Sequence, residues 1–373
     1  MEKAVLRAVR DPRTLAVRLA SRLHDMRSLA LFPEAGRAAF AQETLDYSAP
    51  LAASLGLLEL KSRLEDLSLM TLRPRDYADI LARMSGGPAD PEGYVSSACG
   101  LLRARLAEFG IDSEVRGRHK HVYGVWRKMI LQNLPFDEIY DIFAFRVTVG
   151  SVEACYRALG VVHTVFKPLP GRFKDYVSLP APDGYRSLHT AAVGPDGVRV
   201  EIRIGDPGMR GRRGDDAECL LDLEGRGADG PVRAFLDTLA AALAAGSRDP
   251  SAMLARLRKA LDPDGPVLAF TPRDAPVKLP QGATPIDFAY RIHPGLGDRL
   301  RAAFVDGNPV GLGHRLGSLS TVLIVTDNSA RPADDWLEMA ASPKTRAMIR
   351  RSLAARPPAG PGGGTAHAGR GAR

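Results

Sequence analysis

Side chains that can bind phosphate are concentrated in residues 116–129, where Arg118 and Lys120 come first and Lys128 follows eight residues after Lys120. A helix that begins near His119 would carry both lysines on one side, because eight residues are slightly more than two turns. Its N-terminus would add partial positive charge and free N–H groups. On composition alone, a solvated basic helix face is the simpler interpretation. The alternative is a polyphosphate site, which the motifs farther along the chain favour.

A second group of polar side chains falls on a predicted β-hairpin. Residues 195–197 (Pro-Asp-Gly) indicate a three-residue loop, a type I turn closed by a left-handed glycine. This loop pairs Ala191 with Glu201 and His189 with Arg203. Because side chains alternate along a strand, one face becomes polar and the other apolar. The polar face collects Tyr185, Ser187, His189, Arg199, Glu201 and Arg203, and the apolar face collects Leu188, Val200, Ile202 and Ile204. A titratable face of this kind is a candidate site.

The composition fits a globular protein of two or three domains. The chain has 373 residues, 45% hydrophobic content and a net charge of +8. The positive charge agrees with a nucleotide or RNA ligand but is weak evidence by itself. The three cysteines are far apart and show no metal-ligand or disulfide spacing. The first residues do not form a signal peptide, and no apolar run reaches membrane-spanning length, so we expect a cytoplasmic protein without a membrane partner.

The first hundred residues are predicted to be helical. Apolar side chains recur at helical spacing in residues 15–26, after an Asp-Pro start at 11–12. A second helix is predicted over 49–70, and a third runs from the break at 86–88 to Gly110. The second helix carries a charged face that comprises Glu59, Lys61, Arg63, Glu65 and Asp66.

Mixed α/β structure is expected from residue 111 to 204. A strand is predicted over 141–149, a helix over 152–160 and a further strand over 163–166, followed by the hairpin. Residues 205–230 are charged and rich in glycine, which favours a loop, and a helix is expected over 232–261.

The remaining part of the chain predicts a small β-rich unit. Thr284 is an expected N-cap, with Pro285 at the first helical position and Asp287 in the first turn. Strands are predicted over 267–270, 277–279, 302–305 and 321–326, with an Asp-Gly turn at 306–307. A last helix is predicted over 334–355, and the Pro/Gly-rich end should be disordered.

Five motifs occur in an order and at a spacing that resemble the RelA/SpoT family, which makes and degrades the guanosine alarmones ppGpp and pppGpp. The synthetase motifs of that family correspond to residues 117–129, 140–147, 172–176, 183–190 and 201–204. Residues 284–293 are similar to the TGS domain of the same family. The resemblance reaches to about Leu353.

The resemblance implies an α+β multidomain fold with a nucleotidyltransferase-like mixed sheet, flanking helices and a small β-grasp (TGS) domain. The expected domains are a helical remnant of an HD-type hydrolase domain (1–85), a synthetase domain (86–225), a linker helix (226–263), the TGS domain (264–328), a C-terminal helix (329–356) and a disordered tail (357–373).

The implied reaction transfers pyrophosphate from ATP to the 3′-hydroxyl of GDP or GTP in the presence of Mg²⁺. The resemblance assigns Asp141 and Glu201 as catalytic residues and metal ligands, with Glu201 also able to accept the hydroxyl proton. It assigns nucleotide or phosphate contacts to Arg118, Lys120, His121, Tyr123, Lys128, Arg172, Lys174, Tyr185 and His189. Tyr185 would stack on guanine, whereas the plainer interpretation is a half-buried strand aromatic.

The hydrolase motif departs from the family pattern. Ser21 stands where the family has a metal-binding aspartate, and a hydroxyl is a poor substitute for that carboxylate. His24 and Asp25 look like an HD pair but occupy the family's His-Asn position. The other ligands of the family would precede residue 1. We therefore expect no hydrolase activity and a helical remnant that packs beside the synthetase.

The synthetase motifs also depart from the pattern. Ala181 replaces a lysine, Asp183 an asparagine, and Arg186 and Arg203 each a glutamine, while Gly124 replaces a serine. One lost charged hydrogen bond costs about 1.5–3 kcal/mol, which slows an enzyme without abolishing its activity. Several such losses would leave a non-catalytic protein that binds guanine nucleotide, which is the second interpretation.

The third interpretation is a protein that contacts tRNA or the ribosome. In long family members the TGS domain meets the tRNA acceptor end. Residues 297–299 read Gly-Asp-Arg in place of the usual Gly-His-Arg, which weakens that expectation.

Overall fold

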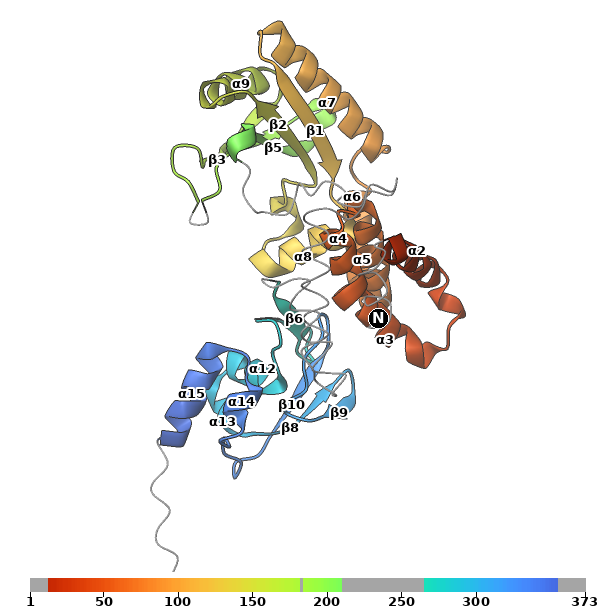
Figure 1. Cartoon of the computed structure of the whole chain (residues 1–373), viewed down its shortest axis with the longest axis vertical. Helices are drawn as coiled ribbons and strands as arrows, with labels where there is room; N and C mark the ends of the chain where they lie inside the picture. The colour runs from red at the N-terminus through yellow and green to blue at the C-terminus, as the bar shows by residue number, and fades with distance from the viewer. Residues whose placement is uncertain (1–12, 182–183, 210–264, 355–373) are drawn as a thin grey trace, which may run out of the picture. The chain divides into compact units, whose positions relative to one another are not determined.

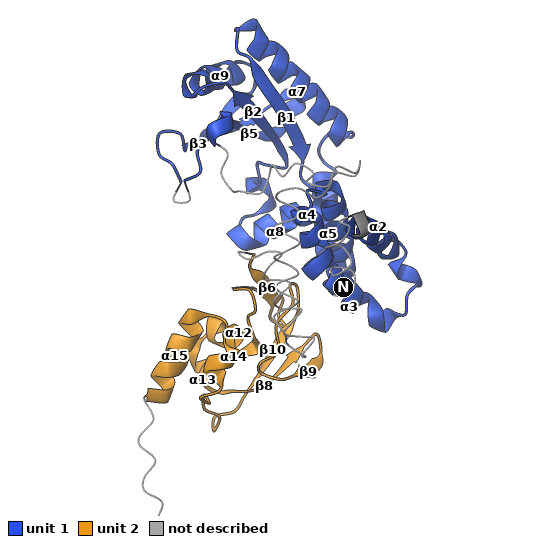
Figure 2. Ribbon diagram, viewed as in Figure 1, with its two compact units in different colours: residues 1–262 blue, residues 263–373 orange. Residues whose placement is uncertain are grey.

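The computed structural model describes residues 13–181, 184–209 and 265–354. The chain forms two compact units, residues 1–262 and 263–373 (Figure 2), and each is described by itself. The expected linker helix, the disordered tail and most of the loop over 205–230 lie outside the described residues. The finer domain boundaries remain predictions. None of the described helices is long and apolar enough to cross a membrane.

The first unit begins with a helical region (Figure 1). Its elements are α2 (Arg13–Arg27), η1 (Leu29–Leu31), α3 (Glu34–Glu43), η2 (Thr44–Ser48), α4 (Ala49–Ser54), α5 (Leu58–Leu72) and α6 (Pro74–Met84). Leu15, Leu19 and Met26 of the predicted stripe are buried together. The single helix predicted over 49–70 is wrong. The chain breaks at Gly56, whose φ of +72° is left-handed, a conformation that glycine adopts without steric cost.

A five-stranded mixed sheet follows the helical region, with strand order β1-β2-β5-β4-β3. The strands are β1 (Ser113–His119), β2 (Phe143–Val149), β3 (Lys167–Asp175), β4 (Leu188–Val193) and β5 (Arg199–Gly205). β2 and β5 are parallel, and the other neighbours are antiparallel. The intervening helices are α7 (Pro91–Glu108), α8 (Val122–Gln132), η3 (Phe136–Glu138), α9 (Val152–Val165), η4 (Pro195–Gly197) and η5 (Pro207–Met209).

One face of this sheet is an apolar core. Phe145 of β2 and Ile202 of β5 pack there with Leu102 of α7 and Val162 of α9. The alternation predicted for the hairpin is confirmed, since Leu188, Val200, Ile202 and Ile204 are all fully buried. The opposite face carries the polar side chains.

Two sequence predictions in this part of the chain are wrong. Residues up to His119 form strand β1, paired with Phe143 of β2, so the helix expected to begin near His119 begins at Val122. Helix α9 continues to Val165, because apolar residues at helical spacing keep packing on the sheet, and the strand predicted over 163–166 starts only at Lys167.

The predicted hairpin register is confirmed. Ala191 pairs with Glu201 and His189 pairs with Arg203. The loop itself differs from the prediction, because Asp196 (φ 57°) precedes Gly197 (φ 75°) in the left-handed region. Two consecutive left-handed residues close the hairpin instead of one.

The second unit contains two small sheets and four helices among the described residues. Its elements are β6 (Val267–Phe270), β7 (Pro276–Leu279), α12 (Pro285–Ile292), α13 (Pro294–Asp298), β8 (Leu300–Val305), β9 (Asn308–Val310), β10 (Val322–Thr326), α14 (Trp336–Met339) and α15 (Pro343–Ala354). The predicted N-cap Thr284 and first-turn acid Asp287 are confirmed, and the two residues form a capping box. The last helix, predicted as one, is interrupted between Met339 and Pro343, where the proline begins a new helix. The α+β class expected from the sequence is confirmed.

Candidate active site

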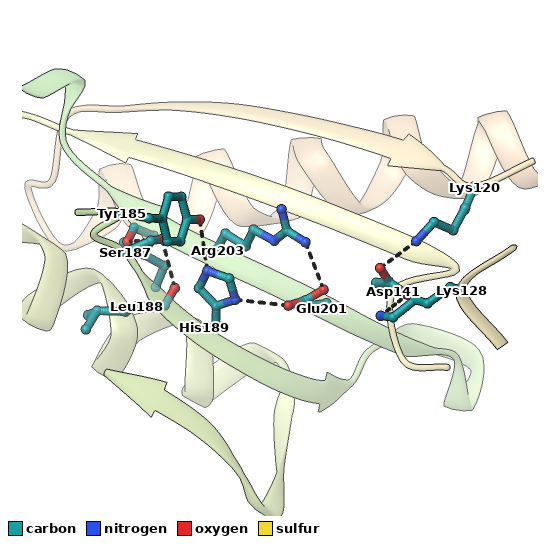
Figure 3. A network of polar contacts seen from close by, with 10 residues as sticks. Lys120, Lys128, Asp141, Tyr185, Ser187, Leu188, His189, Glu201 and Arg203 are labelled. Atoms are coloured by element: carbon teal, nitrogen blue, oxygen red, sulfur yellow. Dashed lines mark hydrogen bonds and ion pairs between the residues drawn. The ribbon is translucent and has the colours of Figure 1, made fainter. Parts of the chain in front are cut away.

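The polar face of the five-stranded sheet carries a connected chain of side chains (Figure 3). The Tyr185 hydroxyl lies 2.9 Å from Nε2 of His189, and Nδ1 of His189 lies 3.1 Å from Oε1 of Glu201. Arg203 donates from Nη2 to Oε2 of Glu201 at 3.3 Å. The β4–β5 hairpin and the segment before it therefore bring together four of the six polar residues predicted for this face, whereas Ser187 and Arg199 bond to the backbone oxygens of Ile204 and Asp137.

The sheet register aligns positive side chains across this face. One row of paired positions crosses all five strands and consists of Arg116, Arg146, Arg203, His189 and Lys174. The neighbouring row places Arg118 of β1 beside Ala144 of β2 and Glu201 of β5. The face is suited to an anionic ligand, because arginine or lysine side chains come from β1, β2, β5 and β3, and β4 adds the imidazole of His189. The contributions of Arg116 and Arg146 were missed, although both lie in or beside sequence motifs.

Asp141 precedes β2 and is paired with two lysines. Lys120 donates from Nζ to Oδ2 of Asp141 at 2.7 Å, and Nζ of Lys128 lies 2.8 Å from Oδ1. Asp141 is only 3% exposed. Its Oδ1 has an ion-pair partner but no hydrogen bond of acceptable geometry among the described residues. Lys120 follows β1 and Lys128 lies on α8, so three separate segments meet at this carboxylate.

Both carboxylates are held in the ionised form. Burial alone would raise the pKa of Asp141, but the charges of Lys120 and Lys128 outweigh it and lower the pKa to about 2. Burial would likewise raise the pKa of Glu201, but the hydrogen bond from His189 and the charge of Arg203 lower it to about 2. The charge of Asp141 acts in the raising direction on the pKa of Glu201, which agrees with a position of Asp141 just before β2, the parallel neighbour of β5.

Arg118 and the two predicted cations of β3 surround this centre less tightly. The charge of Arg118 helps to lower the pKa of Lys120, for which burial is the largest cause. Arg172 is exposed, with its guanidinium 4.8 Å from the ring centre of Tyr140. Lys174 is exposed and is paired in register with His189.

His121 and Tyr123 contact helix α5. Nε2 of His121 lies 2.7 Å from Oε2 of Glu65, and the backbone N–H of Tyr123 donates to Oδ1 of Asp66 at 2.8 Å. The prediction that the first N–H groups of this helix are free for phosphate is therefore wrong for Tyr123. The sequence placed Glu65 and Asp66 on a charged helix face, and Glu65 is buried in the structure. The assignment of His121 and Tyr123 to nucleotide binding stays a prediction.

Tyr185 is 4% exposed and packs edge-on against two rings. Its ring centre lies 6.1 Å from that of Tyr176 and 5.6 Å from that of His189. This arrangement matches the plainer interpretation of a strand aromatic, and stacking on guanine stays a prediction. Tyr176 was missed as a site residue, although it ends the motif over 172–176 and its ring centre lies 5.2 Å from that of His189.

Several departures from the family pattern have visible structural contexts. Ser21 is exposed and donates from Oγ to the backbone oxygen of Val17 at 3.0 Å. Ala181 is buried in a turn whose backbone bonds involve Tyr185. Asp298 accepts from the Tyr290 hydroxyl at 2.8 Å and also contacts Ser352 in α15. Asp183 lies outside the described residues.

A metal site cannot be assembled from protein ligands alone in this part of the chain. No group of three or more His, Cys, Asp or Glu side chains suited to a metal ion occurs among the described residues. Asp141 and Glu201 are two carboxylates, and a Mg²⁺ ion held by one or two carboxylates takes its other ligands from water and substrate phosphates.

These features define an α+β protein with a cationic sheet face, a helical N-terminal region and a small β-rich unit. The family described as the region found in RelA/SpoT proteins matches residues 117–212, the TGS domain matches 267–326, and the HD domain matches 1–58. The chain belongs to the RelA/SpoT family and carries a remnant of the HD domain.

Similar proteins include a GTP pyrophosphokinase from Myxococcus xanthus, 38% identical over 93% of this chain and 46% of that protein. The bifunctional (p)ppGpp synthase/hydrolase SpoT from Escherichia coli is 36% identical over 94% of this chain and 50% of that protein. The chain thus spans about half the length of the curated relatives it matches. A crystal structure of the small alarmone synthetase 1 from Bacillus subtilis bound to its product pppGpp aligns with a TM-score of 0.29 and 23% identity, over 32% of this chain and 69% of that one.

Proposed function

We propose that this chain is a GTP pyrophosphokinase-type synthetase of (p)ppGpp. It transfers pyrophosphate from ATP to the 3′-hydroxyl of GDP or GTP and releases AMP. The observation that carries the proposal is the convergence of Asp141, Glu201 and His189 with two lysines on one cationic face. These residues come from motifs spread over residues 117–204. Asp141 is buried and Glu201 is partly buried, and the pKa of each carboxylate is lowered to about 2.

The chemistry needs aligned reactants and neutralised charge more than it needs a covalent intermediate. Lys120 and Lys128 already meet at Asp141, so a polyphosphate placed there would find two partly buried ammonium groups. Arg118 adds charge from β1, and Arg172 and Lys174 add it from β3. In this proposal the lysines exchange Asp141 for the phosphates of ATP.

We propose Mg²⁺ as the cofactor, with Asp141 as its main protein ligand. A buried, ionised carboxylate fits this ion once the lysines contact phosphate instead. When bound, Mg²⁺ supplies positive charge to the phosphate oxygens. Both oxygens of Glu201 are engaged by His189 and Arg203, and a pKa of about 2 makes it a weak base. We therefore assign Glu201 to positioning the metal and the acceptor rather than to accepting the hydroxyl proton.

We also propose that the chain lacks hydrolase activity. A hydrolase metal would need a carboxylate at position 21, but the Ser21 hydroxyl bonds to its own helix.

A second candidate function is binding of guanine nucleotide without catalysis. The observation that favours it is the pairing of Glu201 with Arg203, where the family motif has glutamine. In this alternative the extra cation holds the carboxylate in an inactive arrangement. Contact of the TGS domain with tRNA or the ribosome remains a third proposal.

The test is to incubate the purified protein with labelled ATP, Mg²⁺ and either GDP or GTP, and to separate ppGpp, pppGpp and AMP. We expect alarmone and AMP in equal amounts, and neither from Asp141→Asn or Glu201→Gln. Absence of product from a folded preparation that still binds GDP would reject the synthetase and support the binding protein. Product from Arg203→Gln but not from the parent protein would identify a tuned-down enzyme.

A further inference from the structure

Helix α8 carries part of the candidate site but does not cap its own first turn. Its N-cap residue is His121, whose side chain makes no capping hydrogen bond within the described residues. The oxygen that accepts from the backbone N–H of Tyr123 comes instead from Asp66, 57 residues earlier on α5. Such a bond satisfies one of the N–H groups that a helix start leaves without partners.

Two further carboxylates of the helical region hold the same helix. Oε2 of Glu65 lies 2.7 Å from Nε2 of His121, and Oδ2 of Asp76 on α6 accepts from Nε1 of Trp126 at 3.0 Å. Figure 1 shows α8 in the helical region beside α5 and α6. The three contacts fix α8 at its start and one turn later.

The phosphate-binding lysines flank these anchored positions. Lys120 immediately precedes His121, and Lys128 follows Trp126 by two residues on α8. Both ammonium groups reach Asp141, at 2.7 Å and 2.8 Å. A displacement of α8 would therefore move the two cations relative to that carboxylate.

We propose that Glu65 and Asp66 of α5 are positioning residues of the synthetase site, which place Lys120 and Lys128 for the phosphates of ATP by anchoring the start of α8. This inference rests on the proposed function. It assigns a role in synthesis to a helix of the N-terminal helical region, at positions where the sequence alone indicates only a charged helix face.

The contacts distinguish positioning from generic surface charge. Glu65 is 9% exposed and its Oε2 also accepts from Lys61 at 2.9 Å. Glu59 on the same helix is exposed and pairs with Arg63 on its own helix. Burial raises the pKa of Asp66, while the nearby His121 charge and the N–H of Tyr123 lower it. Glu59 is thus a matched control acid on α5.

The first experiment compares Asp66→Ala, Asp66→Asn and Glu59→Ala in steady-state synthesis. Loss of an N-cap costs about 0.5–2 kcal/mol, which corresponds to roughly 2- to 30-fold. We expect Asp66→Ala to raise KM for ATP within that range, with kcat at saturating ATP and KM for GDP unchanged. Asp66→Asn retains an acceptor oxygen for Tyr123 and should restore most of the loss. Glu59→Ala should behave like the parent protein.

A purely structural role predicts a different pattern. A destabilised protein has a smaller active fraction, which lowers kcat and leaves KM for ATP unchanged. That result, or equal KM values for Asp66→Ala and Glu59→Ala, would overturn the inference. If Asp66→Ala fails to fold, Glu65→Ala gives the same test, since it removes the His121 contact and leaves the Asp66 bond in place.

A binding measurement separates this inference from the proposed function. Calorimetric titration with α,β-methylene-ATP, whose α–β bridge cannot be cleaved, needs no turnover. We expect the dissociation constant of Asp66→Ala to rise by the same factor as KM. If the parent protein makes alarmone but Asp66→Ala binds the analogue normally, only the positioning role is rejected. If the parent binds the analogue and makes no alarmone, the proposed synthetase function is rejected. The ratio of the dissociation constants of Asp66→Ala and the parent protein then still tests the positioning role. If the parent does not bind the analogue, both are rejected.

Discussion

Replacement of Asp141 by asparagine removes the one charge that both Lys120 and Lys128 contact in the described structure. The carboxylate is 3% exposed, and its pKa falls from an ordinary 3.8 to about 2. At 1.36 kcal/mol per pKa unit, this difference corresponds to about 2 kcal/mol of stabilisation at neutral pH. The lysine side chains are 17% and 24% exposed, so solvent compensates for only part of the lost pairing.

The direction of the pH dependence follows from the lowered pKa. Because the folded-state pKa lies below the unfolded value, the stabilisation is complete above about pH 4 and is lost as the pH falls towards 2. We expect urea unfolding at pH 7, monitored by the fluorescence of Trp126 in a Trp336→Phe background, to show a loss of about 2 kcal/mol for Asp141→Asn. Asp137→Asn, an exposed control, should change the free energy by less than about 0.5 kcal/mol.

The same substitution should have an opposite effect on ligand binding. With Asp141 neutral, Lys120 and Lys128 no longer exchange a carboxylate for phosphate, so ATP should bind more tightly in the presence of EDTA. A stability loss below about 0.5 kcal/mol together with unchanged or weaker ATP binding would refute the view that the two lysines are held by this carboxylate.

Two further predictions concern the hairpin and the core. Arg203→Gln removes a cation from Glu201, so the pKa of Glu201, measured by NMR titration of the labelled carboxyl group, should rise from about 2 towards its ordinary 4.5; an unchanged pKa would show that Arg203 has no such effect. Gly117→Ala should destabilise the protein by about 1–3 kcal/mol in denaturant unfolding, because the new Cβ would lie 2.8 Å from the ring of Phe145. Gly100→Ala in the interior of α7, where nothing lies within 4 Å of the added atom, should instead stabilise it by about 0.5–1 kcal/mol, and equal effects of the two substitutions would contradict the packing argument.

The amino-acid sequence by itself determined the features that depend on neighbouring residues. The register of the β4–β5 hairpin followed from a short loop and strict alternation, which together placed His189 opposite Arg203. The N-cap at Thr284, with Asp287 in the first turn, followed from residue types within four positions. The ordered motifs also identified the family and the residues around Asp141 and Glu201, while their roles in catalysis remain proposals.

Features that depend on distant partners were decided by the tertiary structure. Residues 113–119 became a strand because β2 offered an unpaired edge, and backbone pairing of that kind leaves no periodic signal in a short, polar segment. The sequence indicated only that Glu65 and Asp66 belong to a charged helix face. In the structure they lie against the start of α8, more than 50 residues away in sequence. Periodicity shows which side of a helix is polar. Only packing decides which polar residues face water and which form hydrogen bonds to another helix.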